Sequence, residues 1–171
     1  TMLEMSVTID SNMMTNAYYT GLYSYYYSKY KSLSYNTIIT SATSSTQYGM
    51  YLYYYNTFDD GIIGNRIRLQ TTSSGYGIYT YYTNRSSAYG AKGNAMIVNN
   101  EIIKPQGTSS AYGFYNYYGN VDFINNSIYL AGTSSCYGIY GGTMSSSYSR
   151  SLLNNNVMTN TSSTTNYPIY Y

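Results

Sequence analysis

The sequence has no His, no Trp and a single Cys, and only 8% of its 171 residues are charged. Its net charge of +2 is too small and too dispersed for a phosphate-binding surface, so we expect no nucleic-acid partner. The lack of His removes the side chain that most often acts as a general base near neutral pH. A lone Cys excludes an internal disulfide framework, and we expect Cys136 to be a small buried side chain.

Long apolar runs and helix-forming residues are also scarce. No run of about 18 apolar residues occurs, which argues against a membrane-spanning helix, and the first residues lack the basic and apolar regions of a signal peptide. Tyr, in contrast, occurs 29 times, among many Ser, Thr, Asn and Gly residues. Because Tyr, Ile, Val and Thr favour strands, the composition predicts an all-β protein with one domain over residues 1–171.

One short phrase recurs six times along the chain. It consists of an apolar residue, an Asn three positions later and an apolar residue two positions after that, as in Phe123, Asn126 and Ile128. The period of about 29 residues is that of a repeat protein, and the lack of helical periodicity and of regular Leu positions favours a β-solenoid over helical or leucine-rich repeats. The repeated asparagines are Asn12, Asn36, Asn65, Asn100, Asn126 and Asn155.

A second phrase follows each copy of the first. It places a Tyr directly after an apolar residue, with Gly before that residue in five copies and Pro168 in the sixth. The spacing from Asn to this Tyr is nearly constant, whereas the return to the next Asn varies. The longest return predicts a loop insertion at residues 83–94. The repeated tyrosines are Tyr23, Tyr51, Tyr79, Tyr115, Tyr140 and Tyr170.

The two phrases together predict a β-solenoid of about six coils, in which equivalent residues stack above one another. We expect the Asn residues to lie at tight bends in the left-handed backbone region and to form an inward hydrogen-bonded ladder. The apolar columns would fill a narrow core, and the Gly would allow close backbone approach. Since side chains alternate along a strand, an inward Ile139 places Tyr140 outward, so the tyrosines would form an outer ladder.

The sequence motif "FINNSIYL…YGIY" resembles the right-handed parallel β-helix repeat of pectin-lyase-like folds and of many bacterial surface proteins. The resemblance extends from about Val7 to Tyr171 and implies a single right-handed parallel β-helix. The Tyr-rich style is similar to repetitive secreted proteins of Bacteroidota-like bacteria, which implies an extracellular or cell-surface location. Lyases and hydrolases of this fold carry clustered charged residues on one outer face, often with calcium.

No such cluster is evident in the sequence. Asp59 and Asp60 are adjacent and are expected in a solvated turn, while Asp10 and Asp122 fall in different columns. The basic residues form no column either. We therefore expect no enzymatic activity, no metal and no cofactor. One charged contact is predicted: Arg66 and Glu101 each follow a ladder Asn in consecutive coils and would face each other as an exposed pair.

Two classes of function fit these features. The first is an extracellular structural protein that stacks end to end into filaments, with Val7, Ile9, Tyr167, Ile169 and Tyr171 at the assembly ends. The alternative is an adhesin or carbohydrate-binding solenoid that uses the tyrosine stripe to contact glycans; the same stripe could instead join neighbouring solenoids side by side. Pro168 is compatible with either a cap or a strand edge. The chain is compatible with either a whole protein or a segment of a longer solenoid.

Overall fold

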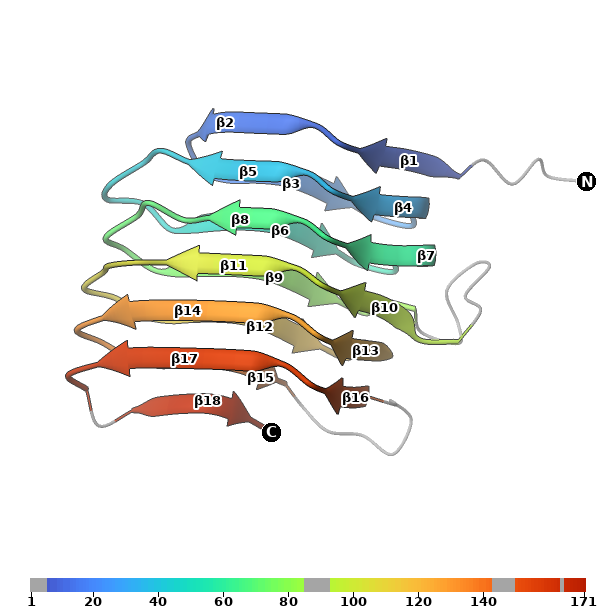
Figure 1. Cartoon of the computed structure of the whole chain (residues 1–171). Helices are drawn as coiled ribbons and strands as arrows, with labels where there is room; N and C mark the ends of the chain where they lie inside the picture. The colour runs from blue at the N-terminus through green and yellow to red at the C-terminus, as the bar shows by residue number, and fades with distance from the viewer. Residues whose placement is uncertain (1–5, 85–92, 143–149, 164) are drawn as a thin grey trace, which may run out of the picture.

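The computed structural model describes residues 6–84, 93–142, 150–163 and 165–171, and these residues form eighteen strands and no helix. Every strand belongs to one of three six-stranded parallel sheets, which we name A, B and C. One strand from each sheet makes up a coil, so six coils are stacked along the axis (Figure 1). The predicted all-β solenoid is confirmed.

Each sheet takes every third strand of the chain. Sheet A contains β1 (Val7–Asp10), β4 (Lys29–Ser34), β7 (Thr57–Ile63), β10 (Ala95–Val98), β13 (Val121–Ile124) and β16 (Arg150–Leu153). Sheet B contains β2 (Met13–Ala17), β5 (Thr37–Thr40), β8 (Arg66–Arg68), β11 (Glu101–Lys104), β14 (Ser127–Gly132) and β17 (Asn156–Thr161). Sheet C contains β3 (Thr20–Tyr25), β6 (Gln47–Tyr53), β9 (Gly75–Tyr81), β12 (Ala111–Tyr117), β15 (Cys136–Gly141) and β18 (Asn166–Tyr170).

The coil is right-handed. In Figure 1 the strands of sheets A and B run from right to left across the front, and those of sheet C return behind them. Each new coil lies below the preceding one, so rotation and advance together give a right-handed helix. The coil-to-coil pairing is parallel in all three sheets, which brings residues that share a position in the repeat into direct register.

Three inward columns form the core. Each apolar position of the repeat pairs with its equivalent in the next coil, for example Ile62 with Ile97, Ile67 with Ile102, and Phe114 with Ile139. The inner members of these columns are buried, and the outermost ones, apart from Leu22, are partly buried or exposed. Cys136 is also buried in the core, as predicted.

The left-handed bends occur one residue earlier than the repeat predicts. None of the ladder Asn residues has a positive φ angle. Instead, the residue before each of them does, and in the middle coils these residues are Tyr35, Gly64, Asn99 and Asn125, with φ between 54° and 65°. The bend that ends sheet A is therefore made by the preceding residue, which leaves the ladder Asn free to point inward. At Gly64 the Tyr35 ring fills the space that a β-carbon would need.

The glycine before each inward apolar residue of sheet C allows neighbouring coils to approach closely. A β-carbon on Gly77 would lie 2.4 Å from the Gly113 carbonyl oxygen and 2.4 Å from Ile102 Cγ2. Both atoms belong to the next coil and are held by sheet pairing, so neither has room to retreat. The predicted close approach is confirmed at this position.

Replacing Gly77 by Ala is therefore expected to destabilise the fold by about 3 kcal/mol, the cost of forcing an extra methyl group into a packed core. Chemical denaturation monitored by far-ultraviolet circular dichroism measures this effect. Gly113→Ala should behave alike, because its β-carbon would meet Ile128 and the Gly138 carbonyl oxygen in the same way. If both substitutions left the free energy of unfolding nearly unchanged, the tight coil spacing would be contradicted.

The loop insertion expected at 83–94 falls largely on residues 85–92, which lie outside the described residues. The flanking strands end at Tyr81 and resume at Ala95. Within the described residues, no helix is long and apolar enough to cross a membrane.

Candidate functional site: the asparagine ladder and the tyrosine face

The repeated asparagines form one continuous hydrogen-bonded ladder. At every step the backbone N–H and the side-chain amide of one Asn both donate to the side-chain oxygen of the Asn in the next coil, at 2.9–3.0 Å. From the second coil onward, the amide also donates to a main-chain carbonyl of the preceding coil at 2.8–2.9 Å. The four inner members are buried. The ladder comprises Asn12, Asn36, Asn65, Asn100, Asn126 and Asn155.

The outer surface of sheet C is covered by stacked tyrosine rings and is called the tyrosine face. The predicted column is continuous through all coils, with ring centroids 4.7–5.4 Å apart and planes within 14° of parallel. It contains Tyr23, Tyr51, Tyr79, Tyr115, Tyr140 and Tyr170. Two further columns stack beside it, and their members are Tyr48, Tyr76, Tyr112, Tyr137 and Tyr167, and Tyr25, Tyr53, Tyr81 and Tyr117.

The first two columns interlock. Rings within a column are parallel, whereas rings of adjacent columns meet edge to face, as in Tyr112 and Tyr115 at 5.4 Å and 83°. Both arrangements are preferred by aromatic quadrupoles and contribute about 0.5–1.5 kcal/mol per pair. The faces of the inner rings are consequently covered by other tyrosines, and the surface presents ring edges and phenol groups to solvent.

A corner beyond sheet C holds tyrosines in an unusual backbone conformation. Tyr27, Tyr55, Tyr82 and Tyr118 have φ angles of 51–59°, which bulky residues rarely adopt. Their rings stack in a fourth column, with centroids 5.1–5.2 Å apart. We attribute the tolerance of this conformation to that stacking. The sequence signal is the one or two Tyr that follow "YxY" in these four coils, which by itself indicates only additional surface tyrosine.

Several phenol groups in the middle of the tyrosine face resist ionisation. Burial, together with repulsion between adjacent phenolates, raises the pKa of Tyr51 and of Tyr115 to about 12. Burial is also the main cause that raises the pKa of Tyr76 and Tyr79. The face is therefore uncharged near neutral pH and provides no phenolate nucleophile.

Comparison with known proteins does not assign the chain to a family. The chain matches no protein-family model, no curated protein and no solved structure at a significant level. The assignment to a β-solenoid of stacked parallel strands with tyrosine clusters rests on the repeat and its geometry.

The predicted charged pair is confirmed. Arg66 and Glu101 are direct partners in the register of β8 and β11, and Arg66 Nε lies 2.5 Å from Glu101 Oε2. Both side chains are exposed, so the pair contributes only ~0–1 kcal/mol.

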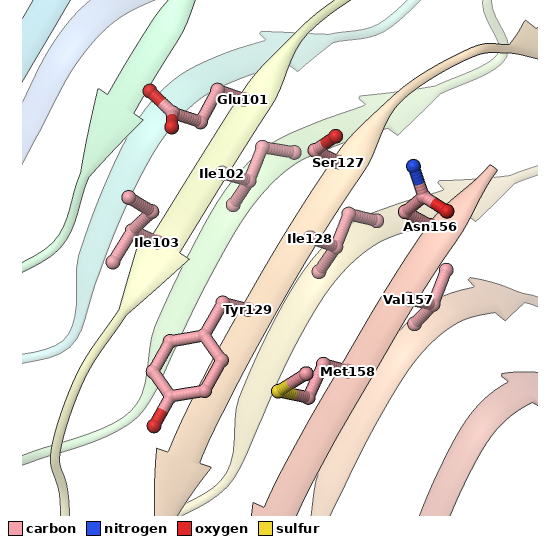
Figure 2. A pocket seen from close by; sticks show the side chains of 9 residues that line it. All are labelled: Glu101, Ile102, Ile103, Ser127, Ile128, Tyr129, Asn156, Val157 and Met158. Carbon is pink, nitrogen blue, oxygen red and sulfur yellow. The ribbon is translucent and has the colours of Figure 1, made fainter.

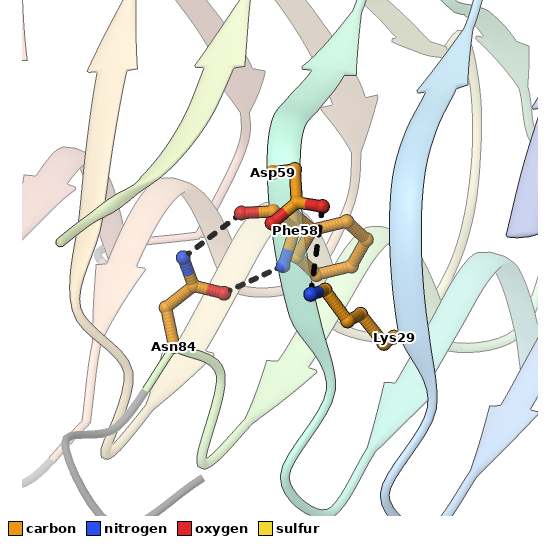
Figure 3. A network of polar contacts seen from close by, with 4 residues as sticks. All are labelled: Lys29, Phe58, Asp59 and Asn84. Carbon is orange, nitrogen blue, oxygen red and sulfur yellow. Dashed lines mark hydrogen bonds and ion pairs between the residues drawn. The ribbon is translucent and has the colours of Figure 1, made fainter. Parts of the chain in front are cut away.

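The prediction that Asp59 and Asp60 lie in a turn is wrong, because both belong to strand β7. The pairing of β4 with β7 shifts register at this point, and two residues of β7 oppose Lys31 alone, which is a β-bulge. The bulge turns both carboxylates outward instead of to opposite faces. Asp59 lies 3.8 Å from Lys29 Nζ, while the Asn84 side chain holds the Phe58 main chain (Figure 3). The described residues contain no group of three potential metal ligands.

Lys104, which the sequence presents only as one of several scattered bases, is fully buried. Its stem packs against Gly75, where a β-carbon would lie 2.8 Å from Lys104 Cε. Its ammonium group donates to the Gln106 carbonyl oxygen at 2.7 Å. Burial lowers the pKa of Lys104. The sequence sign of this inward lysine is strand alternation, since Lys104 lies two residues after the inward Ile102 in β11 and pairs with the buried Leu130.

Lys104→Met is expected to be more stable than the wild type at pH 7 by about 1 kcal/mol or more, because the variant buries no charge. The advantage should shrink as the pH rises towards about 10, the ordinary pKa of lysine. In that range the unfolded wild type binds more protons than the folded one, so its stability increases with pH. Urea denaturation of both proteins at several pH values measures the difference, and a pH-independent gap would show that the pKa of Lys104 is not lowered in the fold.

The assembly residues predicted from sequence lie at opposite ends of the solenoid. Val7 is at the first coil, and Tyr167, Ile169 and Tyr171 are at the last (Figure 1). These four side chains are exposed, with Ile169 at 50%, and Ile9 is partly buried against the core. The inward position of Ile169 in its column makes this exposure notable, since its equivalents Phe114 and Ile139 are buried.

Proposed function

We propose that the chain is a non-catalytic structural solenoid of an extracellular surface protein, whose copies stack end to end into fibres. The resemblance to pectin-lyase-like folds and to Tyr-rich secreted bacterial repeats supports the extracellular location. The observation that carries the proposal is the direction of the asparagine ladder.

The ladder has complementary ends. Among the described residues, Asn12 Oδ1 in the first coil accepts no hydrogen bond and the Asn155 backbone N–H donates none, since within the ladder each Asn donates to the next coil. The last coil thus offers the donor that the first coil of another copy needs. A head-to-tail contact would extend the ladder by the same bond that links the inner coils, and such a contact repeats without closing.

The apolar and aromatic columns are open at the same ends. Leu152 and Val157 in the last coil are only partly buried, as are Ile9 and Met14 in the first. Stacking in register would place Leu152 on Ile9 and Val157 on Met14, which removes apolar surface from water at about 25 cal/mol per Å². Exposed core side chains and unpaired strand edges are the features that favour addition of another coil.

Pro168 weakens this contact in sheet C. It stands in the glycine column, where a β-carbon on Gly138 in the coil above would lie 2.5 Å from the Pro168 carbonyl oxygen. If another copy followed in register, the Pro168 ring would press on its Gly21 and Met14 in the same way. We therefore infer that sheets A and B guide the contact and that Pro168 keeps it weak and reversible.

The experiment is sedimentation and electron microscopy of the purified chain over a wide concentration range. We expect rods that lengthen with concentration, longer rods for Pro168→Gly, and shorter ones for Asn12→Ala, which removes the ladder acceptor. Asn160→Ala is the matched control, because Asn160 is an exposed Asn on a strand. Wild type and Pro168→Gly that both stay monomeric at every concentration would refute end-to-end stacking.

The proposed lack of catalysis rests on how the acids are placed. Asp59 faces Lys29, Glu101 faces Arg66, and both oxygens of Asp10 accept hydrogen bonds from Ser32. No two of these three carboxylates converge on one point. Cleavage of pectin or alginate by the purified chain, lost in Asp59→Asn or Asp60→Asn, would overturn this part of the proposal.

A further inference from the structure

A groove lies on the outer surface of sheet B, on the other side of the coil from the tyrosine face. It runs across strands β11, β14 and β17 and has a volume of about 360 Å³ (Figure 2). Two rows of outward side chains form its walls, one polar and one apolar. Since each row takes one residue from each coil, the groove runs along the solenoid axis.

The apolar row consists of Ile103, Tyr129 and Met158, which are direct partners in the strand register. Tyr129 differs from the tyrosines of sheet C because no described aromatic ring stacks on it. Figure 2 shows one face of its ring turned toward the viewer, and the side chain is half-buried. Met158 beside it is 62% exposed. The groove therefore presents an aromatic ring on which no other described tyrosine stacks, within an apolar strip.

The polar row consists of Glu101, Ser127 and Asn156, again in register. The Ser127 hydroxyl and the Asn156 amide make no side-chain hydrogen bond to the described residues and are exposed. Glu101 is the only charged group of the groove walls, and Arg66 already neutralises it. The row thus supplies hydrogen-bond donors and acceptors without net charge.

We propose that this groove binds a neutral glycan, with the pyranose chain lying along the solenoid axis. A pyranose ring has an apolar face of C–H groups and a polar rim of hydroxyls. The apolar C–H face fits the aromatic ring of Tyr129, and the hydroxyl rim fits the row of Ser127 and Asn156. Successive coils repeat this pair of rows every ~4.8 Å, a spacing close to the length of one sugar unit in an extended chain. The wall residues offer a charged ligand no unpaired counter-charge, since Glu101 is paired with Arg66, and the exposed Arg68, the register partner of Ile103, stands outside the wall residues.

Glycan binding in this groove is independent of the proposed end-to-end stacking, because the groove lies on the side of the solenoid and not on its ends. It also places the glycan on a different surface from the tyrosine stripe of sheet C. The inner tyrosines of that stripe cannot stack on sugars, since other rings cover their faces.

Affinity electrophoresis tests the proposal with soluble polysaccharides in the gel. The neutral probes are hydroxyethyl cellulose, mixed-linkage β-glucan and galactomannan, and the acidic ones are polygalacturonate and alginate. We expect at least one neutral probe to retard the wild type. Tyr129→Ala should weaken that binding by about tenfold or more, the double variant Ser127→Ala/Asn156→Ala should weaken it too, and Tyr129→Phe should largely retain it. Circular dichroism establishes that each variant is folded.

Tyr23→Ala is the control, because Tyr23 is an exposed tyrosine on the other surface, at 61%, whereas Tyr129 is half-buried. Its binding should equal that of the wild type. The proposal is wrong if no neutral probe retards the protein or if only acidic probes do. It is also wrong if Tyr23→Ala loses binding while Tyr129→Ala keeps it, which would place the glycan on the tyrosine face.

Discussion

Replacing Asn100 by Ala is expected to destabilise the solenoid by about 3–5 kcal/mol, the range for breaking a buried hydrogen-bond network. Asn100 Oδ1 accepts from both the backbone and the side-chain amide of Asn65 at 2.9 Å, and its own amide donates to the Ile62 carbonyl oxygen. The substitution leaves these three partners without their bonds inside the core. Their desolvation is then uncompensated, because water cannot reach them.

Chemical denaturation of Asn100→Ala beside Asn160→Ala separates this effect from a general cost of removing an amide. Asn160 is exposed on strand β17, so its variant should remain within about 0.5 kcal/mol of the wild type. Asn100→Asp is a second comparison, since it retains the acceptor but loses the donors. Equal stabilities for Asn100→Ala and Asn160→Ala would mean that the ladder contributes nothing to the fold.

The second large effect is expected from alkaline pH. Folded tyrosines with raised pKa values stay protonated, while the same tyrosines in the unfolded chain ionise near pH 10. The folded state then binds more protons than the unfolded state, so stability is complete below about pH 10 and falls as the pH rises above it. For Tyr51 and Tyr115 the fall extends to about pH 12. Because many stacked tyrosines contribute together, we expect one cooperative unfolding transition in this window.

Near-ultraviolet absorbance reports phenolate and circular dichroism reports strands, and both signals should change in the same step. Tyr79→Phe keeps the stacked ring but removes one resistant phenol, so its midpoint should move to higher pH. Tyr35→Phe serves as the control, because Tyr35 packs against Gly64 away from the tyrosine face. A gradual phenolate titration centred near pH 10, with the strands intact, would contradict the packed state of these rings.

The repeat made most of the fold predictable. Constant offsets within the first phrase fix which residues stack, so the Asn ladder, the apolar columns and the Arg66–Glu101 pair follow from arithmetic and strand geometry alone. Parallel in-register stacking is a strong constraint, because a shift of one residue would turn every inward side chain outward. The predicted tyrosine column follows from the same alternation.

The features that the sequence did not reveal depend on local departures from this regularity. A bulge at Asp59 and Asp60 adds one residue to a strand, and nothing in the spacing distinguishes it from a turn. The burial of Lys104 depends on the space left by Gly75 in the coil before it. The sheet B groove depends on the ring orientation of Tyr129, which alternation places outward but does not orient.

One asparagine ladder runs through every coil, and we propose that it continues from copy to copy. Hydrogen exchange of the ladder backbone amides, measured by nuclear magnetic resonance at several protein concentrations, tests this most directly. We predict slow exchange for Asn36, Asn65, Asn100 and Asn126 at every concentration, and for Asn155 fast exchange in dilute solution that slows as the chains associate. Fast exchange at the four inner positions would contradict the ladder. Fast exchange at Asn155 in chains that sediment as assemblies would contradict its continuation between copies.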